Sequence, residues 1–188
     1  MHNGPIPTPS NDPAKYSVPE LERRFLLHGL PSGTSDPRRI RDRYFEGTRL
    51  RLRLVEDLAG EVLERKLGHK RRPDQADPAA IYHTSLYLNE AEWALLGDLP
   101  GCCLVKVRRT IQAGERRAAV DVFEGPLEGL IMLEVEFRTH QERAAYRPPA
   151  WVGEEVTHRE KFSGGALSAS SGDELRRLLG QFDRQSPL

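Results

Sequence analysis

Hydrophobic and polar residues begin to alternate with a period of two at Val18, and the alternation recurs along most of the chain. Such alternation puts successive side chains on opposite faces of an extended backbone, so it predicts β-strands. Short polar or glycine-containing segments separate most of the alternating stretches, which favours antiparallel connections. The predicted strands cover residues 18–28, 38–45, 48–56, 61–67, 81–88, 103–112, 116–123 and 129–138.

Two segments have the pattern of short helices instead. Asn89 is followed three residues later by Glu92, the spacing of a capping box, and predicts a helix that begins there and runs to about residue 96. Ser171 and Glu174 have the same spacing. They precede a stretch near 173–182 in which apolar residues recur on one helical face, so a second helix is predicted there.

The chain is predicted to form one domain with a tail at each end. Its 188 residues suit a single domain with a substantial core. Residues 1–17 are rich in Pro, Asn and Ser and lack periodicity, so they are predicted to be a disordered tail. The domain is expected to span 18–182, followed by a short tail at 183–188. Within it, the segment 68–80 is basic and then contains Pro and Asp, which predicts a surface loop.

The overall charge excludes some classes of partner. The 28 basic and 28 acidic residues cancel, so no global field would recruit nucleic acid or an anionic membrane. No apolar run approaches the roughly 20 residues of a membrane span, and the N-terminus lacks the apolar core of a signal peptide. The only cysteines, Cys102 and Cys103, are adjacent and form no disulfide framework. A cytoplasmic location is therefore expected, as a monomer or a homodimer.

Blocks of charge on single strand faces carry the functional information. Residues two apart share a face of a strand. Such blocks are Glu20 with Glu22 and Arg24, Arg49 with Arg51 and Arg53, Glu64 with Lys66, Lys106 with Arg108, and Glu134 with Glu136. One interpretation is an antiparallel sheet with a solvated face. The other is a closed barrel whose charged faces look inward on a shared anion and metal, because like charges side by side repel one another on an ordinary surface.

These motifs, in this order, resemble those of the CYTH superfamily, the triphosphate tunnel metalloenzymes. The resemblance covers about residues 18–168. Glu20-Leu21-Glu22-Arg23-Arg24 resembles the family's Glu-x-Glu-x-Lys strand, Arg51-Leu52-Arg53 its Arg-x-Arg strand, Lys66 a lysine of the following strand, and Lys106-Val107-Arg108 the next basic strand. The run of residues 119–130, the pair in Leu133-Glu134-Val135-Glu136-Phe137, and the segment from Trp151 to Lys161-Phe162 resemble the later part of the family pattern.

The resemblance implies an α+β, mainly antiparallel fold, in which eight strands close into a β-barrel around a tunnel with a few peripheral helices. It also implies a metal-dependent hydrolase of inorganic triphosphate or of a small organic triphosphate such as thiamine triphosphate, with Mg²⁺ or Mn²⁺ as cofactor. The implied ligands of the metal or its waters are Glu20, Glu22, Asp121, Glu134 and Glu136. The implied substrate-binding residues are Arg24, Arg51, Arg53, Lys66, Lys106, Arg108 and Lys161. The residues expected to take part in catalysis are Glu20, Glu22, Arg24 and Lys66.

Two departures from the family pattern leave alternatives open. Arg24 stands where the family has a lysine, and a guanidinium is a planar fork rather than a point charge. The stretch 81–88 has no carboxylate where many members carry an Arg-x-Glu-x-Glu strand, so the substrate and the second metal site stay open. A nucleotidyl cyclase acting on ATP and a non-catalytic polyphosphate- or nucleotide-binding module remain alternatives. The absence of a Gly-x-x-x-x-Gly-Lys-Ser/Thr motif argues against a classic P-loop enzyme.

Overall fold

The computed structural model of the chain describes residues 16–71 and 80–182. Its strands are β1 (Val18–Leu26), β2 (Ser35–Tyr44), β3 (Leu50–Glu56), β4 (Val62–Arg71), β5 (Ala80–Tyr87), β6 (Cys102–Ala113), β7 (Arg116–Glu124) and β8 (Ile131–Phe137). The helices are α1 (Glu90–Gly97), α2 (His140–Ala145), α3 (Gly164–Ser168) and α4 (Gly172–Phe182), with short 3-10 turns η1 (Gly125–Leu127) and η2 (Glu160–Phe162).

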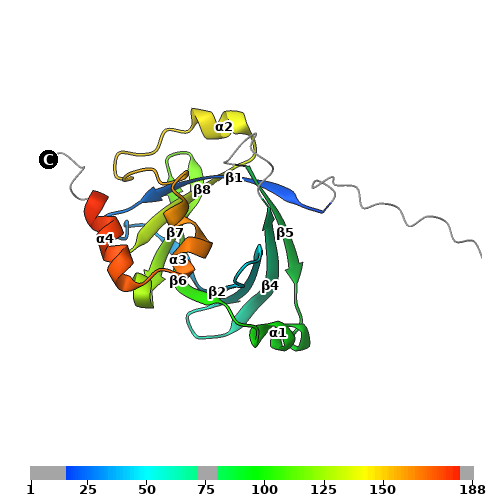
Figure 1. The fold of residues 1–188 in the computed structure, drawn as a ribbon. Helices are drawn as coiled ribbons and strands as arrows, with labels where there is room; N and C mark the ends of the chain where they lie inside the picture. Colours follow the sequence, from blue (N-terminus) through cyan, green and yellow to red (C-terminus); the bar gives the residue numbers. More distant parts are fainter. Residues whose placement is uncertain (1–15, 72–79, 183–188) are drawn as a thin grey trace, which may run out of the picture.

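The eight strands close into a barrel, as the resemblance implied. Around the barrel the order is β1-β5-β4-β3-β2-β6-β7-β8, and β8 pairs back onto β1. Every pairing between neighbouring strands is antiparallel. Figure 1 shows the ring of strands, with α2 beside β1 and β8, and α3 next to β2 and β6. The prediction of a mainly antiparallel barrel with a few outer helices is therefore confirmed.

The local signals in the sequence account for most of the element boundaries. Asn89 and Glu92 form the predicted capping box at the start of α1. The backbone N–H of Ser171 donates to Glu174 Oε2 at 2.7 Å, and the Glu174 N–H donates to Ser171 Oγ at 3.3 Å, so the second box is also present. Between β3 and β4, Gly60 adopts a φ of +91°, a conformation that favours glycine. That turn sets the β3–β4 register on which the site depends.

One prediction about the chain's organisation is wrong. Residues 68–71 do not belong to a surface loop, because β4 continues to Arg71 and pairs with β5 over this stretch. A run of basic residues lacks the alternation of polar and apolar positions when half of its side chains point into a charged interior. The sequence pattern therefore does not indicate a strand there. The rest of that predicted loop, 72–79, lies outside the described residues, as do the tails apart from Tyr16 and Ser17.

Strand register places the charged side chains inside the barrel. Directly paired residues of neighbouring strands share a face. Pairs of this kind are Arg24 with Glu134, Asp42 with Arg53, Arg53 with Lys66, Lys70 with His83, and Arg108 with Asp121. The alternating apolar residues of β1, β7 and β8 therefore point outward, and the interpretation with inward-facing charges is confirmed.

The apolar core accordingly lies in two clusters around a charged interior. One cluster lies on the outer face of β1, β6, β7 and β8, where Tyr146 packs against Phe25 and Phe137 with ring centroids 6.3 and 5.4 Å apart. The other closes one end of the barrel and includes Phe162 and Leu167 from the segments over that end. Burying a Phe or Leu side chain contributes about 1.5–3 kcal/mol. The first cluster therefore stabilises the wall from outside, whereas the second fills one end of the barrel and leaves the charged part of the interior open.

Candidate functional site in the barrel

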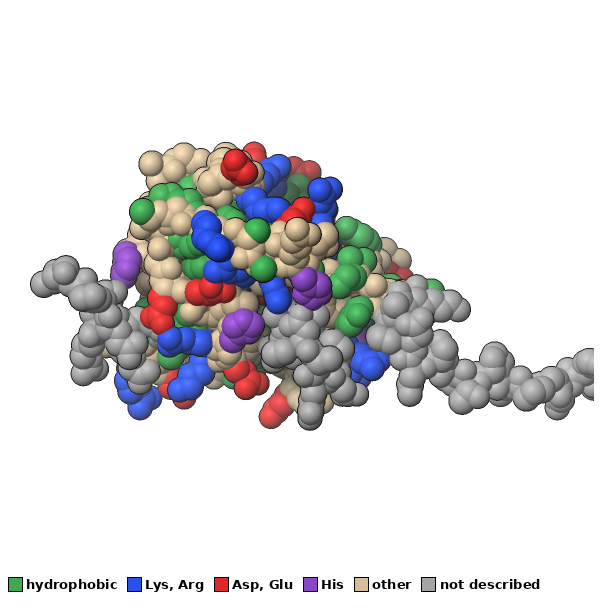
Figure 2. Space-filling model, turned by 90° about the horizontal axis from the view of Figure 1, so that it is seen from above, with side chains coloured by type: hydrophobic (Ala, Val, Ile, Leu, Met, Phe, Trp, Pro, Cys, Tyr) green, Lys and Arg blue, Asp and Glu red, His purple; other side chains and the backbone are tan. Residues whose placement is uncertain are grey.

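A cavity of about 610 Å³ occupies the interior of the barrel. Of the site residues predicted from the sequence, it is lined by Glu20, Glu22, Arg24, Arg51, Arg53, Lys106, Arg108, Glu134 and Glu136. Charges outside the barrel are distributed differently. On the face seen in Figure 2, basic and acidic side chains are interspersed with hydrophobic ones. Inside, in contrast, the basic side chains gather around three carboxylates.

The Asp121 cluster consists of Asp121, Lys106 and Arg108. The Lys106 ammonium donates to Asp121 Oδ2 at 2.5 Å, and Arg108 donates to both carboxylate oxygens at 2.7 Å. Arg108 also bonds the carboxylate of Glu134, so it connects this cluster to β8. Asp121 is fully buried behind the two cations and does not line the cavity. Burial and the charge of Arg108 lower the pKa of Lys106, against the opposing effect of Asp121.

The Asp42 cluster consists of Asp42, Arg51 and Arg53. Arg53 donates two hydrogen bonds, of 2.7 and 2.6 Å, to the Asp42 carboxylate. Arg51 Nε lies 3.7 Å from Asp42 Oδ1. Burial alone would raise the pKa of Asp42, but Arg53, Arg51 and Lys106 outweigh it and lower the pKa to about 2. Sequence reasoning missed Asp42. Its signal was an acidic residue at an inward position of a strand otherwise rich in arginine.

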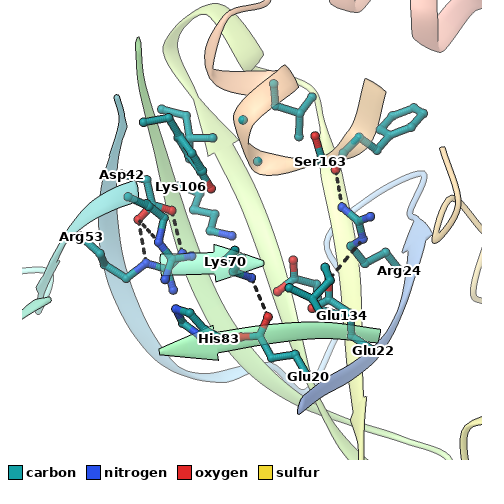
Figure 3. Close-up of a pocket in the computed structure, with 18 of the residues that line it drawn as sticks. Glu20, Glu22, Arg24, Asp42, Arg53, Lys70, His83, Lys106, Glu134 and Ser163 are labelled. Carbon is teal, nitrogen blue, oxygen red and sulfur yellow. Dashed lines mark hydrogen bonds and ion pairs between the residues drawn. The ribbon is translucent and has the colours of Figure 1, made fainter. Parts of the chain in front are cut away.

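The Glu20 cluster consists of Glu20, Lys70 and His83. Lys70 Nζ lies 2.6 Å from Glu20 Oε2, and His83 Nδ1 lies 2.8 Å from Glu20 Oε1. Figure 3 shows both side chains converging on Glu20, with Glu22 and Glu134 close by. Burial alone would raise the pKa of Glu20, but His83 and Lys70 lower it to about 2. Lys70 and His83 were not predicted as site residues, because the first lay in the supposed loop and the second has no motif around it.

Glu22, Glu134 and Glu136 form an acidic strip along β1 and β8. Glu22 pairs with Glu136 across the two strands, and Arg24 pairs with Glu134. Burial and the neighbouring charge of Glu134 raise the pKa of Glu22. Burial would also raise the pKa of Glu134, but Arg108, Lys106 and Lys70 lower it. The strip thus holds excess negative charge that the surrounding cations only partly offset.

Arg24 fixes the cover of the barrel end to β1. Its Nη1 donates to the carbonyl of Phe162 at 2.6 Å and its Nη2 to the carbonyl of Thr157 at 3.0 Å. Its Nε lies 3.4 Å from Glu22 Oε1. The guanidinium brings a separate nitrogen to each carbonyl, whereas a lysine would present a single nitrogen to both. Arg23, the residue before Arg24, points outward and donates two hydrogen bonds to Glu155. Both arginines therefore hold the segment that follows α2.

Tyr44 was not predicted, and it lies at the covered end of the cavity. Burial, followed by the charge of Asp42, raises the pKa of the Tyr44 hydroxyl to about 12, so this group stays protonated. A Cβ atom at Gly164 would collide with that hydroxyl. The glycine at the start of α3 therefore allows the cover to approach the ring closely.

Three predicted site residues do not line the barrel cavity: Asp121, which lies behind its two cations, and the lysines Lys66 and Lys161. Lys66 points inward, but it pairs with Glu64 at 2.5 Å and lies over the Tyr87 ring, 4.9 Å from its centroid. Lys161 lines a separate pocket of about 440 Å³ beside α3 and α4. Their roles in binding and catalysis stay predictions.

The acidic strip carries oxygen donors of the kind that divalent metals bind. Mg²⁺ and Mn²⁺ prefer carboxylate oxygens, and a dication beside the strip would offset the repulsion that raises the pKa of Glu22. In residues 16–71 and 80–182, no three His, Cys, Asp or Glu side chains are arranged as a ready ligand set. The reason is that Glu20, Asp121 and Glu134 are turned to basic partners. Within the same ranges, no helix is long and apolar enough to cross a membrane.

Comparison with known proteins agrees with this architecture. No family model matches the chain. It is 27% identical over 159 residues to the inorganic triphosphatase of Nitrosomonas europaea, an alignment that covers 80% of this chain and 97% of that protein. A crystal structure of the inorganic triphosphatase NE1496 matches with 25% identity and a TM-score of 0.57, covering 80% of this chain and 98% of the other. A structure described as the hypothetical protein NE1496 matches with 26% identity and a TM-score of 0.57, covering 81% and 99%. With its closed barrel and charged interior, the chain has a CYTH-like triphosphate-tunnel fold.

Proposed function

We propose that this chain hydrolyses inorganic triphosphate or a small organic triphosphate with the help of Mg²⁺ or Mn²⁺. The observation that carries the proposal is the cavity, in which basic side chains of β3 and β6 face the acidic strip of β1 and β8. Phosphoryl transfer requires positioning and charge stabilisation more than covalent chemistry, and this arrangement supplies both. The similarity to an inorganic triphosphatase supports the same reaction class.

We assign the metal to Glu22, Glu134 and Glu136. A bound dication would neutralise phosphate charge and polarise the phosphorus that is attacked. Glu20 and Asp121, which the family pattern also implies as ligands, then act through the cations they hold. Their carboxylates are each bound by two basic groups already, so we assign them to orienting these groups.

The remaining roles follow from where the charges lie. Arg53, Lys106 and Arg108 would bind the phosphate oxygens, each held in place by a buried carboxylate. Held in this way, they need no reorganisation when negative charge develops. Water attacking the terminal phosphorus would be oriented by a carboxylate of the acidic strip.

The test is to incubate the purified chain with inorganic triphosphate, thiamine triphosphate or ATP, each with Mg²⁺, Mn²⁺ or EDTA. We expect metal-dependent phosphate release, which Glu22→Ala and Glu134→Ala abolish. Glu61→Ala, in the exposed turn after β3, is the matched control. Full activity in both site variants would contradict the assignment. Triphosphate binding without phosphate release would favour a non-catalytic module, and a cyclic nucleotide product would favour a cyclase.

A further inference from the structure

The Glu20 cluster lies on the wall of the tunnel that faces the Asp121 cluster. In the closed order of eight strands, β5 is four strands from β6 in either direction, and β4 is four strands from β7. His83 thus faces Lys106 and Arg108 across the cavity, Lys70 lies on the strand beside it, and all four side chains line the cavity. An anion between these walls would be reached by basic groups from both sides.

The geometry of Lys70 leaves it free to bind such an anion. An ammonium has three N–H donors. Within the described part of the chain, Lys70 Nζ makes a hydrogen bond only to Glu20, so two donors remain. Its side chain is 33% exposed, and it lines the cavity rather than the outer surface. Its charge also acts on Glu22 and Glu134, so the ammonium lies within the field of the acidic strip.

Gly68 brings a second cation to the same place. A Cβ atom at this position would lie 2.8 Å from His83 Nε2 and 3.4 Å from Arg51 Nη2. The imidazole and the guanidinium therefore meet over the bare backbone of β4, next to Lys70 on the same strand face. Arg51 is 7% exposed, and its Nε has no hydrogen-bond partner among the described residues.

We propose that Lys70, joined over Gly68 by the guanidinium of Arg51, forms a second phosphate subsite, positioned by Glu20 and His83, across the cavity from the subsite of Lys106 and Arg108. This inference rests on the proposed function for its substrate. With cations on both walls, the tunnel selects linear phosphate chains long enough to reach both, namely inorganic triphosphate and longer polyphosphates, over diphosphate. Lys70 is a substrate-binding residue in this arrangement, and His83 is a positioning residue.

The subsite is tested by calorimetric binding of inorganic triphosphate and of pyrophosphate in EDTA. Losing one charge-assisted contact should weaken triphosphate binding about tenfold in Lys70→Gln, with Lys70→Arg restoring most of it. Pyrophosphate, held by the opposite wall alone, should lose less than about threefold. Arg71→Gln, the neighbouring residue on the outer face of β4, is the matched control and should leave both affinities unchanged.

Gly68→Ala tests the geometry without removing a charge. Its new methyl group must displace His83 or Arg51, so triphosphate binding should weaken while pyrophosphate binding is kept. Unchanged triphosphate affinity in both Lys70→Gln and Gly68→Ala, or an equal loss for both anions, would overturn the subsite. A lower melting temperature with unchanged affinity would mean that the Glu20 cluster is only a structural ion pair, and it would overturn the subsite as well. Wild-type protein that binds triphosphate but releases no phosphate would refute the proposed function and leave the subsite standing.

Discussion

The Asp121 cluster and the Glu20 cluster have the same kinds of groups but are buried to different depths in the barrel wall. Each has one carboxylate that holds two basic groups. Asp121 is buried behind its cations and joins two neighbouring strands, β6 and β7. Glu20 lines the cavity itself, its side chain is 26% exposed, and its partners come from β4 and β5. The first cluster is a fixed part of the wall, whereas the second is open to a ligand.

Burial determines how a charged pair responds to the loss of one partner. A buried ion pair is rigid, and removing one partner leaves an uncompensated charge in a poor solvent. A partly exposed pair is screened by water and can exchange its partner for a ligand at small cost. We therefore expect substitutions in the Asp121 cluster to affect folding and catalysis, and those in the Glu20 cluster to affect mainly affinity.

The largest effect should come from Asp121→Asn. Two cations would lose their buried counter-charge, so the free energy of unfolding should fall by about 3–5 kcal/mol. Glu20→Gln removes the matching charge from the open cluster and should cost less, because water partly screens this carboxylate. Urea unfolding monitored by circular dichroism measures both values. Equal losses in the two variants would abolish the distinction between a fixed cluster and an open one.

Arg108→Gln and Lys70→Gln, one from each cluster, should change different kinetic constants. Arg108 joins Asp121 to Glu134, so its loss should lower kcat for triphosphate about 100-fold, as expected for losing one preorganised donor. Lys70→Gln, in contrast, should act chiefly on KM. The control is Arg109→Gln, whose side chain is on the outer face of β6. If Lys70→Gln lowered kcat as strongly and left KM unchanged, Lys70 would belong with the catalytic wall.

The sequence predicted the fixed cluster better than the open one, and strand geometry explains why. Lys106 and Arg108 are two apart on one strand, so their shared face can be read directly from the chain. Lys70 and His83 share a face only through the register between β4 and β5, on either side of the segment 72–79. No spacing along the chain encodes that register.

The rest of the prediction also succeeded where the signal is local in the sequence and failed where it depends on strand pairing. Helix caps were predicted correctly because a capping box is complete within four residues. Asp42 was missed because its partners come from the neighbouring strand β3, and only the β2–β3 pairing brings them together. Closure into a barrel also depends on the β1–β8 pairing between distant parts of the chain. That closure followed from the resemblance to a family, not from the alternation of residues.

The cations of the two clusters are held by carboxylates, whereas Arg24 is held by backbone carbonyls. Arg24→Lys tests this second kind of contact. A lysine could keep one contact to Thr157 or Phe162 but not both, so the free energy of unfolding should fall by about 1–2 kcal/mol. The loosened cover should also make the segment around η2 and α3 exchange its amide hydrogens faster. Hydrogen exchange read by mass spectrometry checks this, with Arg109→Lys as control. Unchanged exchange there would show that Arg24 does not hold the cover.

The smallest effect should be the acid dependence of the open cluster. The pKa of Glu20 is about 2 in the folded chain, below its usual value of 4.5. A lowered pKa means that the carboxylate stabilises the fold above pH 4.5, and that this contribution disappears as the pH falls towards 2. The difference in unfolding free energy between the wild type and Glu20→Gln should therefore shrink between pH 5 and the acid limit of folding. Urea unfolding at stepwise lower pH measures it. A difference that stays constant over this range would mean that the contacts of Glu20 with Lys70 and His83 do not stabilise its charge, and the open cluster would then lose its anchor.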